Sequence, residues 1–434
     1  MPSQTSEAYV WAWLPEATEP VVAGLVQRSG ADYRFAYARS YRGRADAISL
    51  YEPELPLRNG WIEPRGGLRI ASILRDAGPD SWGQRVIIEA LHGDASAVDP
   101  GDVDQITFFL ASASDRIGGL DFQESPATYG ARGGTASLDD LHGAAIELTE
   151  GRDLAPGLAK ALLEGTAVGG ARPKVVIDDG RRSYIAKLSV STDAYAVVKA
   201  EAVGLDLARR VGVDAPQSHL TTSLDRDVLL VERFDRPGGG RRRMMVSGLT
   251  MLGLDEMVGR YATYPELLDA LQRQGSDPEV GRRLFERIVF NIAIGNNDDH
   301  ARNHAAFWDG HELTLTPAYD LSPQPRSGET STQAMAIDRR GNRDSTMQTC
   351  VDAAGVYGLD RDEAVAIVDA QLTIIEESWA EVADANRLTH AERNYLYGRQ
   401  ILNKSISYDF ERPRVRPPTP ARRRPRPELR KPIT

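Results

Sequence analysis

The chain has 434 residues, of which 41% are hydrophobic and 26% charged, and its formal net charge is −10. Chains of this length usually divide into two or three compact units, and the composition excludes collagen-like, low-complexity and wholly disordered proteins. The single cysteine, Cys350, excludes an internal disulfide, four-thiolate zinc sites and cysteine-ligated iron–sulfur clusters. The cysteine content favours a reducing cytoplasm. No signal peptide and no apolar run of about 20 residues are evident.

Charge is unevenly distributed along the chain. Residues 412–434 contain nine Lys or Arg and one acid, a net of +8, which leaves −18 for residues 1–411. An acidic body argues against a general nucleic-acid-binding protein. The basic segment contains seven prolines and little apolar surface, so we expect it to be disordered, either as a solvated tail or as a binding arm.

The first part of the chain mixes strand-like segments with one helix. Strands are expected at 9–14, 34–41 and 47–52, and a helix at 80–91. Residues 113–137 are rich in Gly, Ser and Ala, which is typical of a connection.

The middle of the chain predicts a helix, a β-hairpin, a second helix and a buried strand. The first helix spans 138–150, and the hairpin strands KVVI and SYIAKLS flank a turn that opens with Asp-Asp-Gly. The second helix spans 194–211, and the strand is DVLLVERFD at 227–235. Residues 245–411 are mostly helical in pattern, so the fold class is α+β with the helical part later.

The most informative segment is the polar run NNDDHARNH at 296–304, which directly follows an apolar helical pattern. Nine nearly continuous polar residues after a core helix are costly unless they cap it or carry out chemistry. Asp298 and Asn303 have the spacing of phosphoryl-transfer loops, in which the Asp accepts the proton of the nucleophile and the Asn holds magnesium. Two alternatives stay open: a hydrophilic loop, and a transition-metal site of Asp298, His300 and His304.

A second hairpin follows this loop, because AAFWD and LTLTP flank an Asp-Gly turn. A hairpin brings its two ends together, so Asn303 and Asp320 should converge. Oxygen ligands of this kind suit a magnesium ion that also binds nucleotide phosphates. The alternative for Asp320 is a helix N-cap or a turn residue.

A small-residue segment and two charged residues lie upstream. Lys187 is on an otherwise apolar strand face, and Glu201 is on the inward stripe of the next helix. They would form the strand-lysine and helix-glutamate pair of kinases, although a strand lysine more often extends to solvent. Small residues let backbone N–H groups approach phosphates, and the segment lacks a Walker motif. It consists of Gly169, Gly170, Ala171, Arg172, Pro173 and Lys174.

Glu232, Arg233 and Phe234 end the buried strand, where backbone groups could bind an adenine edge. The candidate parts of the site occur in the order that kinases use. This order is a glycine-containing loop, a strand lysine, a helix glutamate, a linking strand, the Asp-x4-Asn segment and a final Asp. That order favours a phosphotransferase.

Several segments resemble the signatures of the HipA-type serine/threonine kinases, the toxin components of bacterial type II toxin–antitoxin modules. They are VGGARPK, YIAKLS, VERFDR, NNDDHARN, TPAYDLSP and, near residue 80, GPDSWGQRVI. The resemblance implies an α+β, protein-kinase-like two-lobed fold. Its parts would be a small N-terminal α/β subdomain at 1–110, an N-lobe at 111–235 and a helical C-lobe at 236–411. The basic, Pro-rich tail at 412–434, which its composition predicts to be disordered, lies beyond the resemblance.

The resemblance also implies roles for individual residues. Asp298 would be the catalytic base, Asn303 and Asp320 the metal ligands, Lys187 the ATP lysine and Glu201 its structural ion-pair partner. Further nucleotide contacts are implied for residues 169–174, Glu232, Arg233, Phe234, His300, Ala301, Arg302, Asn303, Tyr319 and Asp320.

The implied activity is ATP- and Mg²⁺-dependent transfer of phosphate to a Ser or Thr of a translation-related protein, such as an aminoacyl-tRNA synthetase. The implied partner is a small helix-turn-helix antitoxin. The protein would contact DNA only indirectly, through this antitoxin, and we expect no membrane as a partner. The alternatives are a non-catalytic, nucleotide-binding corepressor of an antitoxin and a small-molecule kinase.

One departure from the family concerns regulation. Members often carry a serine just before the glycine-containing loop, and autophosphorylation of this serine ejects the loop. Ala167 stands where we would place that serine, although Thr166 could replace it. Arg172 and Pro173 also replace the glutamine–acid pair of the best-known toxin.

Overall fold

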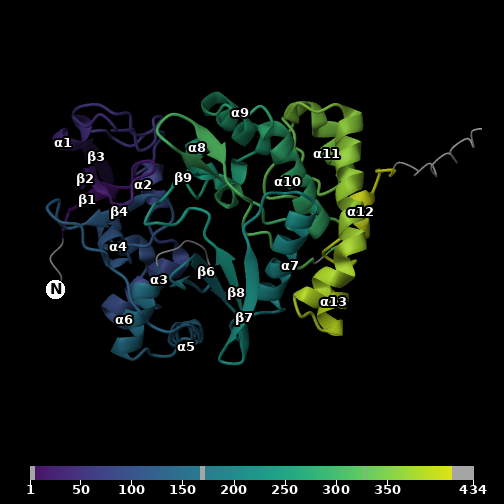
Figure 1. Cartoon of the computed structure of the whole chain (residues 1–434), viewed down its shortest axis with the longest axis horizontal. Coiled ribbons are helices and arrows are strands. Elements are labelled where there is room, and N and C mark those ends of the chain that lie inside the picture. Colours follow the sequence, from purple (N-terminus) through teal and green to yellow (C-terminus); the bar gives the residue numbers. More distant parts are fainter. Residues whose placement is uncertain (1–4, 167–171, 327, 413–434) are drawn as a thin grey trace, which may run out of the picture.

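The fold is α+β, as the sequence predicts. The computed structural model describes residues 5–166, 172–326 and 328–412, and in these ranges helices surround three small antiparallel sheets (Figure 1). The expected tail at 413–434 lies outside the described residues. Arg412, just before it, forms ion pairs with Asp369 and Glu376 of helix α12 (Arg361–Ala385).

The N-terminal unit is built on a four-stranded sheet in the order β3-β2-β1-β4. Its fourth strand comes from residues 120–123, so the sheet extends past residue 110, where the sequence placed the boundary. Segment 47–52, expected as a strand, is largely irregular because the Leu50 N–H donates to the Tyr37 hydroxyl at 2.8 Å instead of to a neighbouring strand. The elements are β1 (Glu7–Ala12), β2 (Val21–Ser29), β3 (Asp32–Tyr37), α1 (Arg39–Arg42), α2 (Ser72–Asp76), α3 (Ser81–His92), η1 (Pro100–Asp102), α4 (Gln105–Ala111) and β4 (Leu120–Gln123).

The middle unit contains a second four-stranded sheet in the order β5-β6-β8-β7. The expected hairpin is its first pair of strands, and it sets Lys174 directly opposite Lys187. The helices expected at 80–91, 138–150 and 194–211 are present as α3, α5 and α7. The elements of this unit are α5 (Leu138–Thr149), α6 (Pro156–Gly165), β5 (Lys174–Asp178), β6 (Ser183–Leu188), α7 (Val197–Arg210), β7 (Ser218–Ser223) and β8 (Arg226–Glu232).

The C-terminal unit is mainly helical and contains a small sheet in the order β11-β10-β9. The hairpin expected after the polar run is the pair β10–β11. Helix α12 runs along one edge of the molecule (Figure 1). The elements are β9 (Met244–Ser247), α8 (Gly248–Leu252), η2 (Gly259–Tyr261), α9 (Tyr264–Gln274), α10 (Val280–Ile294), η3 (Ala301–Asn303), β10 (Ala305–Trp308), β11 (Leu313–Leu315), α11 (Met347–Ala353), η4 (Ala354–Tyr357), α12 (Arg361–Ala385), α13 (His390–Leu396) and η5 (Lys404–Ser407).

Helix α10 carries the core toward the polar run. Phe285, Ile288 and Ile292, which recur at helical spacing, are all 0% exposed. The helix ends at Gly295, whose φ of 72° is the left-handed conformation that glycine adopts without steric cost. The polar run therefore begins at a fixed point on the core. In the ranges that the structure covers, no helix combines the length and apolar character needed to cross a membrane.

Candidate active site

Lys187 lies between two carboxylates from different elements. Its Nζ forms an ion pair with Glu201 of α7 and donates to Oδ1 of Asp320 at 2.6 Å. Burial alone would lower the pKa of this ammonium, but the two carboxylates raise it above its usual range. The positive charge of Lys187 in turn holds the pKa of Asp320 well below its usual value. The pairing expected from the sequence is present, with Asp320 as a second partner.

Asp320 is held in an unusual backbone conformation. Its φ of 58° is in the left-handed region, which costs about 1 kcal/mol for a residue other than glycine. The Asp320 carbonyl accepts a hydrogen bond from Asn296 Nδ2 at 3.3 Å. On the following residue, the Leu321 carbonyl packs so closely on α7 that a Cβ at Gly204 would lie 1.9 Å from its oxygen. The segment is therefore fixed by both α7 and the polar loop.

The polar loop presents Asp298 and Asn303 from one tight turn. The Asp298 carbonyl accepts hydrogen bonds from the His300 N–H at 2.9 Å and from Asn303 Nδ2 at 3.2 Å. The Tyr319 hydroxyl donates to the Arg302 carbonyl at 2.7 Å, which ties the end of the β10–β11 hairpin to its beginning. Asn303 and Asp320, each adjacent to one of these residues, therefore lie at the same end of the hairpin.

The surroundings of Asp298 raise its affinity for a proton. Burial raises the pKa of this carboxyl, and the negative charges of Asp320 and Asp299 raise it further against the opposing effect of His300. A carboxylate with higher proton affinity is a better general base near neutral pH.

Asp299, which the sequence did not single out, is the organising residue of the loop. It is 1% exposed, and its Oδ2 accepts hydrogen bonds from Tyr264 Oη at 2.6 Å, Asn291 Nδ2 at 2.7 Å and His304 Nε2 at 2.9 Å. Two consecutive acids were the only sequence signal, and the spacing argument selected only Asp298.

The alternative transition-metal site is not supported. His304 is 0% exposed and bound to Asp299 rather than facing Asp298. Among the residues with described positions, no group of three or more His, Cys, Asp or Glu side chains could hold a metal ion. Asn303 and Asp320 instead offer oxygen atoms, since Nδ2 of Asn303 is already bound to the backbone and leaves its Oδ1 for a cation. Oxygen donors of this type fit magnesium.

The small-residue segment is only partly described. Gly169, Gly170 and Ala171 lie outside the described residues, as does Ala167. Arg172 forms an ion pair with Asp193. Lys174, at the start of β5, is 8% exposed, and burial lowers the pKa of its ammonium.

Thr166, the alternative regulatory residue, is 1% exposed. Its hydroxyl is therefore not accessible to a second active site in this conformation.

The linking strand has two N–H groups that are already bound. Glu232 and Arg233 donate them to the carbonyls of Gln217 and Ser183 at 2.8 and 2.9 Å, so neither N–H is available to adenine, and the nucleotide contacts of these residues stay predictions. The Arg233 side chain is 0% exposed and binds two carboxylates within the protein. Phe234, whose ring packs 5.9 Å from that of Tyr319, is the better candidate for a nucleotide contact.

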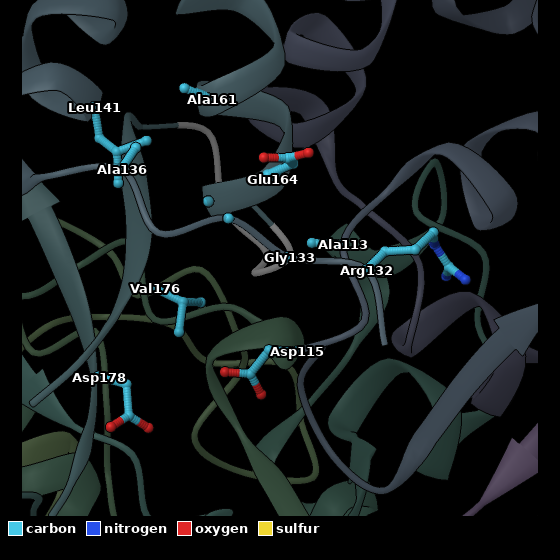
Figure 2. A pocket seen from close by; sticks show the side chains of 12 residues that line it. Ala113, Asp115, Arg132, Gly133, Ala136, Leu141, Ala161, Glu164, Val176 and Asp178 are labelled. Atoms are coloured by element: carbon cyan, nitrogen blue, oxygen red, sulfur yellow. The ribbon is translucent and has the colours of Figure 1, made fainter. Parts of the chain in front are cut away.

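A cavity of about 150 Å³ lies at the β5 edge, between this strand and helices α5 and α6. Figure 2 shows the carboxylates of Asp115, Glu164 and Asp178 around it. Val176, also in its lining, shares a strand face with Lys174, because side chains alternate along a strand. The cavity therefore adjoins the face that carries the two lysines.

Comparison with known structures places the chain in the class of α+β proteins. A chain of the solved complex of the Shewanella oneidensis MR-1 toxin–antitoxin system HipA, HipB and its operator DNA matches with a TM-score of 0.68. The match covers 92% of this chain and 97% of the other, at 18% identity, and establishes the fold. The Helicobacter pylori proinflammatory kinase CtkA matches with a TM-score of only 0.36 at 14% identity, covering 56% of this chain and 94% of CtkA.

Within that class, residues 166–379 match the HipA-like C-terminal domain family. These residues, just under half of the chain, carry the domain of this family, and the resemblance seen in the sequence is confirmed for them. The candidate kinase Y4mE of Sinorhizobium fredii is 25% identical over 191 residues, which cover 42% of this chain. The match spans 45% of Y4mE, less than half of that protein.

Proposed function

We propose that the protein is an ATP- and Mg²⁺-dependent serine/threonine protein kinase of the HipA type. The observation that carries the proposal is the position of Lys187 between Glu201 and Asp320, at the end of the hairpin where Asp298 and Asn303 lie. A lysine on a sheet, a helix glutamate and a loop of this spacing are the parts that protein kinases use.

In this proposal each residue has one task. Lys187 binds phosphate oxygens of ATP, and Glu201 keeps its ammonium in place. Asp298 accepts the proton of the acceptor hydroxyl. The hydroxyl oxygen bonds to the γ-phosphorus of ATP while the bond between that phosphorus and ADP breaks. Asn303 and Asp320 would hold the magnesium ion, which neutralises charge on the phosphates.

The sheet face with the two lysines would carry the nucleotide. Lys174 and Lys187 would meet the phosphates, and half-buried Val176 and Ile185 offer apolar contact to the base. Phe234 would lie near the adenine end. This arrangement agrees with the amphiphilic character of ATP, whose charge is at one end.

The partners belong to the same proposal. The Shewanella system contains HipA, HipB and operator DNA, and we propose that this chain likewise binds a small helix-turn-helix antitoxin. A net charge of −18 on residues 1–411 disfavours direct DNA binding, so a basic antitoxin would make that contact. A translation-related protein, such as an aminoacyl-tRNA synthetase, is the proposed target, and the cytoplasm is the proposed location.

The test is transfer of label from γ-labelled ATP. With Mg²⁺ and a cell lysate, the wild-type protein should label itself or a lysate protein on phosphoserine or phosphothreonine, and Asp298→Ala should not. Asp309→Asn, an acid at the tip of the neighbouring hairpin, is the matched control and should label normally. Equal labelling by Asp298→Ala would contradict the proposal. ATP binding without transfer would favour the corepressor, and label only in small molecules would favour a small-molecule kinase.

A further inference from the structure

Helix α2 of the N-terminal unit packs against the β9–α8 junction of the C-terminal unit, residues 247–250. The last residue of α2, Asp76, accepts hydrogen bonds there through both carboxylate oxygens. The Ser247 N–H and the Thr250 hydroxyl donate to Oδ2, each at 2.8 Å. The Ser247 hydroxyl donates to Oδ1 at 2.9 Å. One carboxylate therefore holds the end of β9 and the first turn of α8.

The same junction lies against the polar loop of the candidate active site. The Gly248 N–H donates to the His304 carbonyl at 2.7 Å, and the last residue of β9 is paired with Ala305 of β10. Gly248 also packs so closely on the loop that a Cβ at this position would overlap the Ala301 carbonyl. The junction therefore fixes the backbone on both sides of Asn303, the candidate magnesium ligand.

Helix α2 is itself anchored in the N-terminal unit. The buried Glu54 carboxylate accepts the N–H groups of Ser72 and Ile73 at 3.0 and 2.8 Å, which satisfies two donors of the first turn. Near the other end of the helix, the Arg75 guanidinium donates to the Leu254 carbonyl at 3.2 Å. Helix α2 therefore contacts α8 at its start and again just beyond its end.

We propose that Asp76 is a positioning residue for phosphate transfer. Through this carboxylate the N-terminal unit holds the β9–α8 junction where the polar loop needs it, so Asp76 acts through the loop and not on the substrates. A carboxylate suits this task, because hydrogen bonds to a charged acceptor are stronger than those between neutral groups. The inference rests on the proposed function, because it concerns the rate of that reaction.

The test compares phosphate transfer at saturating ATP and Mg²⁺ by the wild type, Asp76→Ala and Asp104→Ala. Asp104 is the matched control, a half-buried acid of the same unit whose partners, the Ile106 N–H and Arg28, lie within that unit. Both variants lose hydrogen bonds at the start of a helix, so both should lower the urea midpoint of unfolding. Only Asp76→Ala should also slow transfer, by about tenfold, because misplacing a reacting group by about 1 Å costs up to about 100-fold.

The Thr250 hydroxyl tests the same contact with a milder change. Thr250→Val removes the hydroxyl and should slow transfer about threefold, and Thr250→Ser, which keeps the hydroxyl, should recover most of that rate. In the Asp76→Ala background, Thr250→Val should have little further effect, because its partner is already absent. The KM for ATP should stay within about twofold of the wild-type value throughout, because Lys187 and Glu201 are unchanged.

The outcomes separate this inference from the proposed function. Transfer by Asp76→Ala at the rate of Asp104→Ala would overturn the inference alone, as would equal rates of Thr250→Val and Thr250→Ser, because the wild type still transfers phosphate. If Asp76→Ala does not fold, the two Thr250 variants decide. If the wild type transfers no phosphate, the proposed function fails, and the positioning role of Asp76 fails with it.

Discussion

At the scale of single residues, the adjacent acids Asp298 and Asp299 have opposite surroundings. Asp299 accepts three hydrogen bonds in the core, whereas Asp298 is exposed and offers its carbonyl, not its carboxylate, to the turn. The carboxylate of Asp298 is thereby left for chemistry, and that of Asp299 sets the shape of the loop.

Substitution of Asp299 should therefore act on stability. Asp299→Ala leaves the buried donors of Tyr264, Asn291 and His304 without their acceptor, and each such group costs about 1–3 kcal/mol. We expect a loss of at least about 3 kcal/mol in the free energy of unfolding, measured in urea. The control Asp352→Ala removes an exposed acid paired with exposed Arg361 and should change stability by less than about 1 kcal/mol. Equal effects of the two substitutions would refute the role of Asp299.

At the scale of elements, α7 positions the site from two points one turn apart. Glu201 binds Lys187, and Gly204 lets the backbone at Leu321 pack against the helix. Glycine in a helix interior costs about 1 kcal/mol relative to alanine. The close approach of the Leu321 carbonyl explains why this cost is accepted here.

Gly204→Ala should separate α7 from the segment that carries Asp320. The new Cβ would meet the Leu321 oxygen at 1.9 Å, so the backbone must shift. We expect a loss of about 2 kcal/mol in stability, as for other overpacked core sites, and reduced phosphate transfer. Gly143→Ala in α5 is the control, since its nearest neighbour is the Leu224 side chain at 3.6 Å. If Gly204→Ala behaved like this control, the close packing would not matter.

At the scale of the whole molecule, a buried ion network joins the N-terminal unit to the strand that links the lobes. Arg233 contacts Asp115 at 3.0 Å and Asp235 at 2.9 Å, and it donates to the Arg116 carbonyl at 2.7 Å. Asp235 also accepts the Gly118 N–H at 2.8 Å. The contacts with Asp115, Arg116 and Gly118 each span more than a hundred residues of sequence.

Removing one side of this network should weaken the joint between the units. Arg233→Met removes a positive charge that binds the carboxylates of Asp115 and Asp235. We therefore expect a loss of about 3 kcal/mol in the free energy of unfolding. Arg241→Met, whose exposed pair with Glu16 lies at the surface, should lose less than about 1 kcal/mol. Urea denaturation followed by tryptophan fluorescence measures both, and equal midpoints would contradict the structural role of Arg233.

The features that the sequence predicted depend on residues close together in the chain, and those that it missed depend on residues far apart. Both hairpins, helix α7 and the Lys187–Glu201 pair were predicted, because turn residues and periodicity are local signals. Strand β4 and the Arg233 network were not, since their partners lie about a hundred residues away. The roles of the site residues stay predictions.

The most direct test of the central claim is the rate of phosphate transfer per bound nucleotide, at saturating ATP and Mg²⁺, for the wild type and Asp298→Asn. The account predicts that Asp298→Asn binds Mg²⁺-ATP with nearly wild-type affinity but transfers phosphate at least about 100-fold more slowly, because only the proton acceptor is lost. Transfer at the wild-type rate by Asp298→Asn would contradict the account.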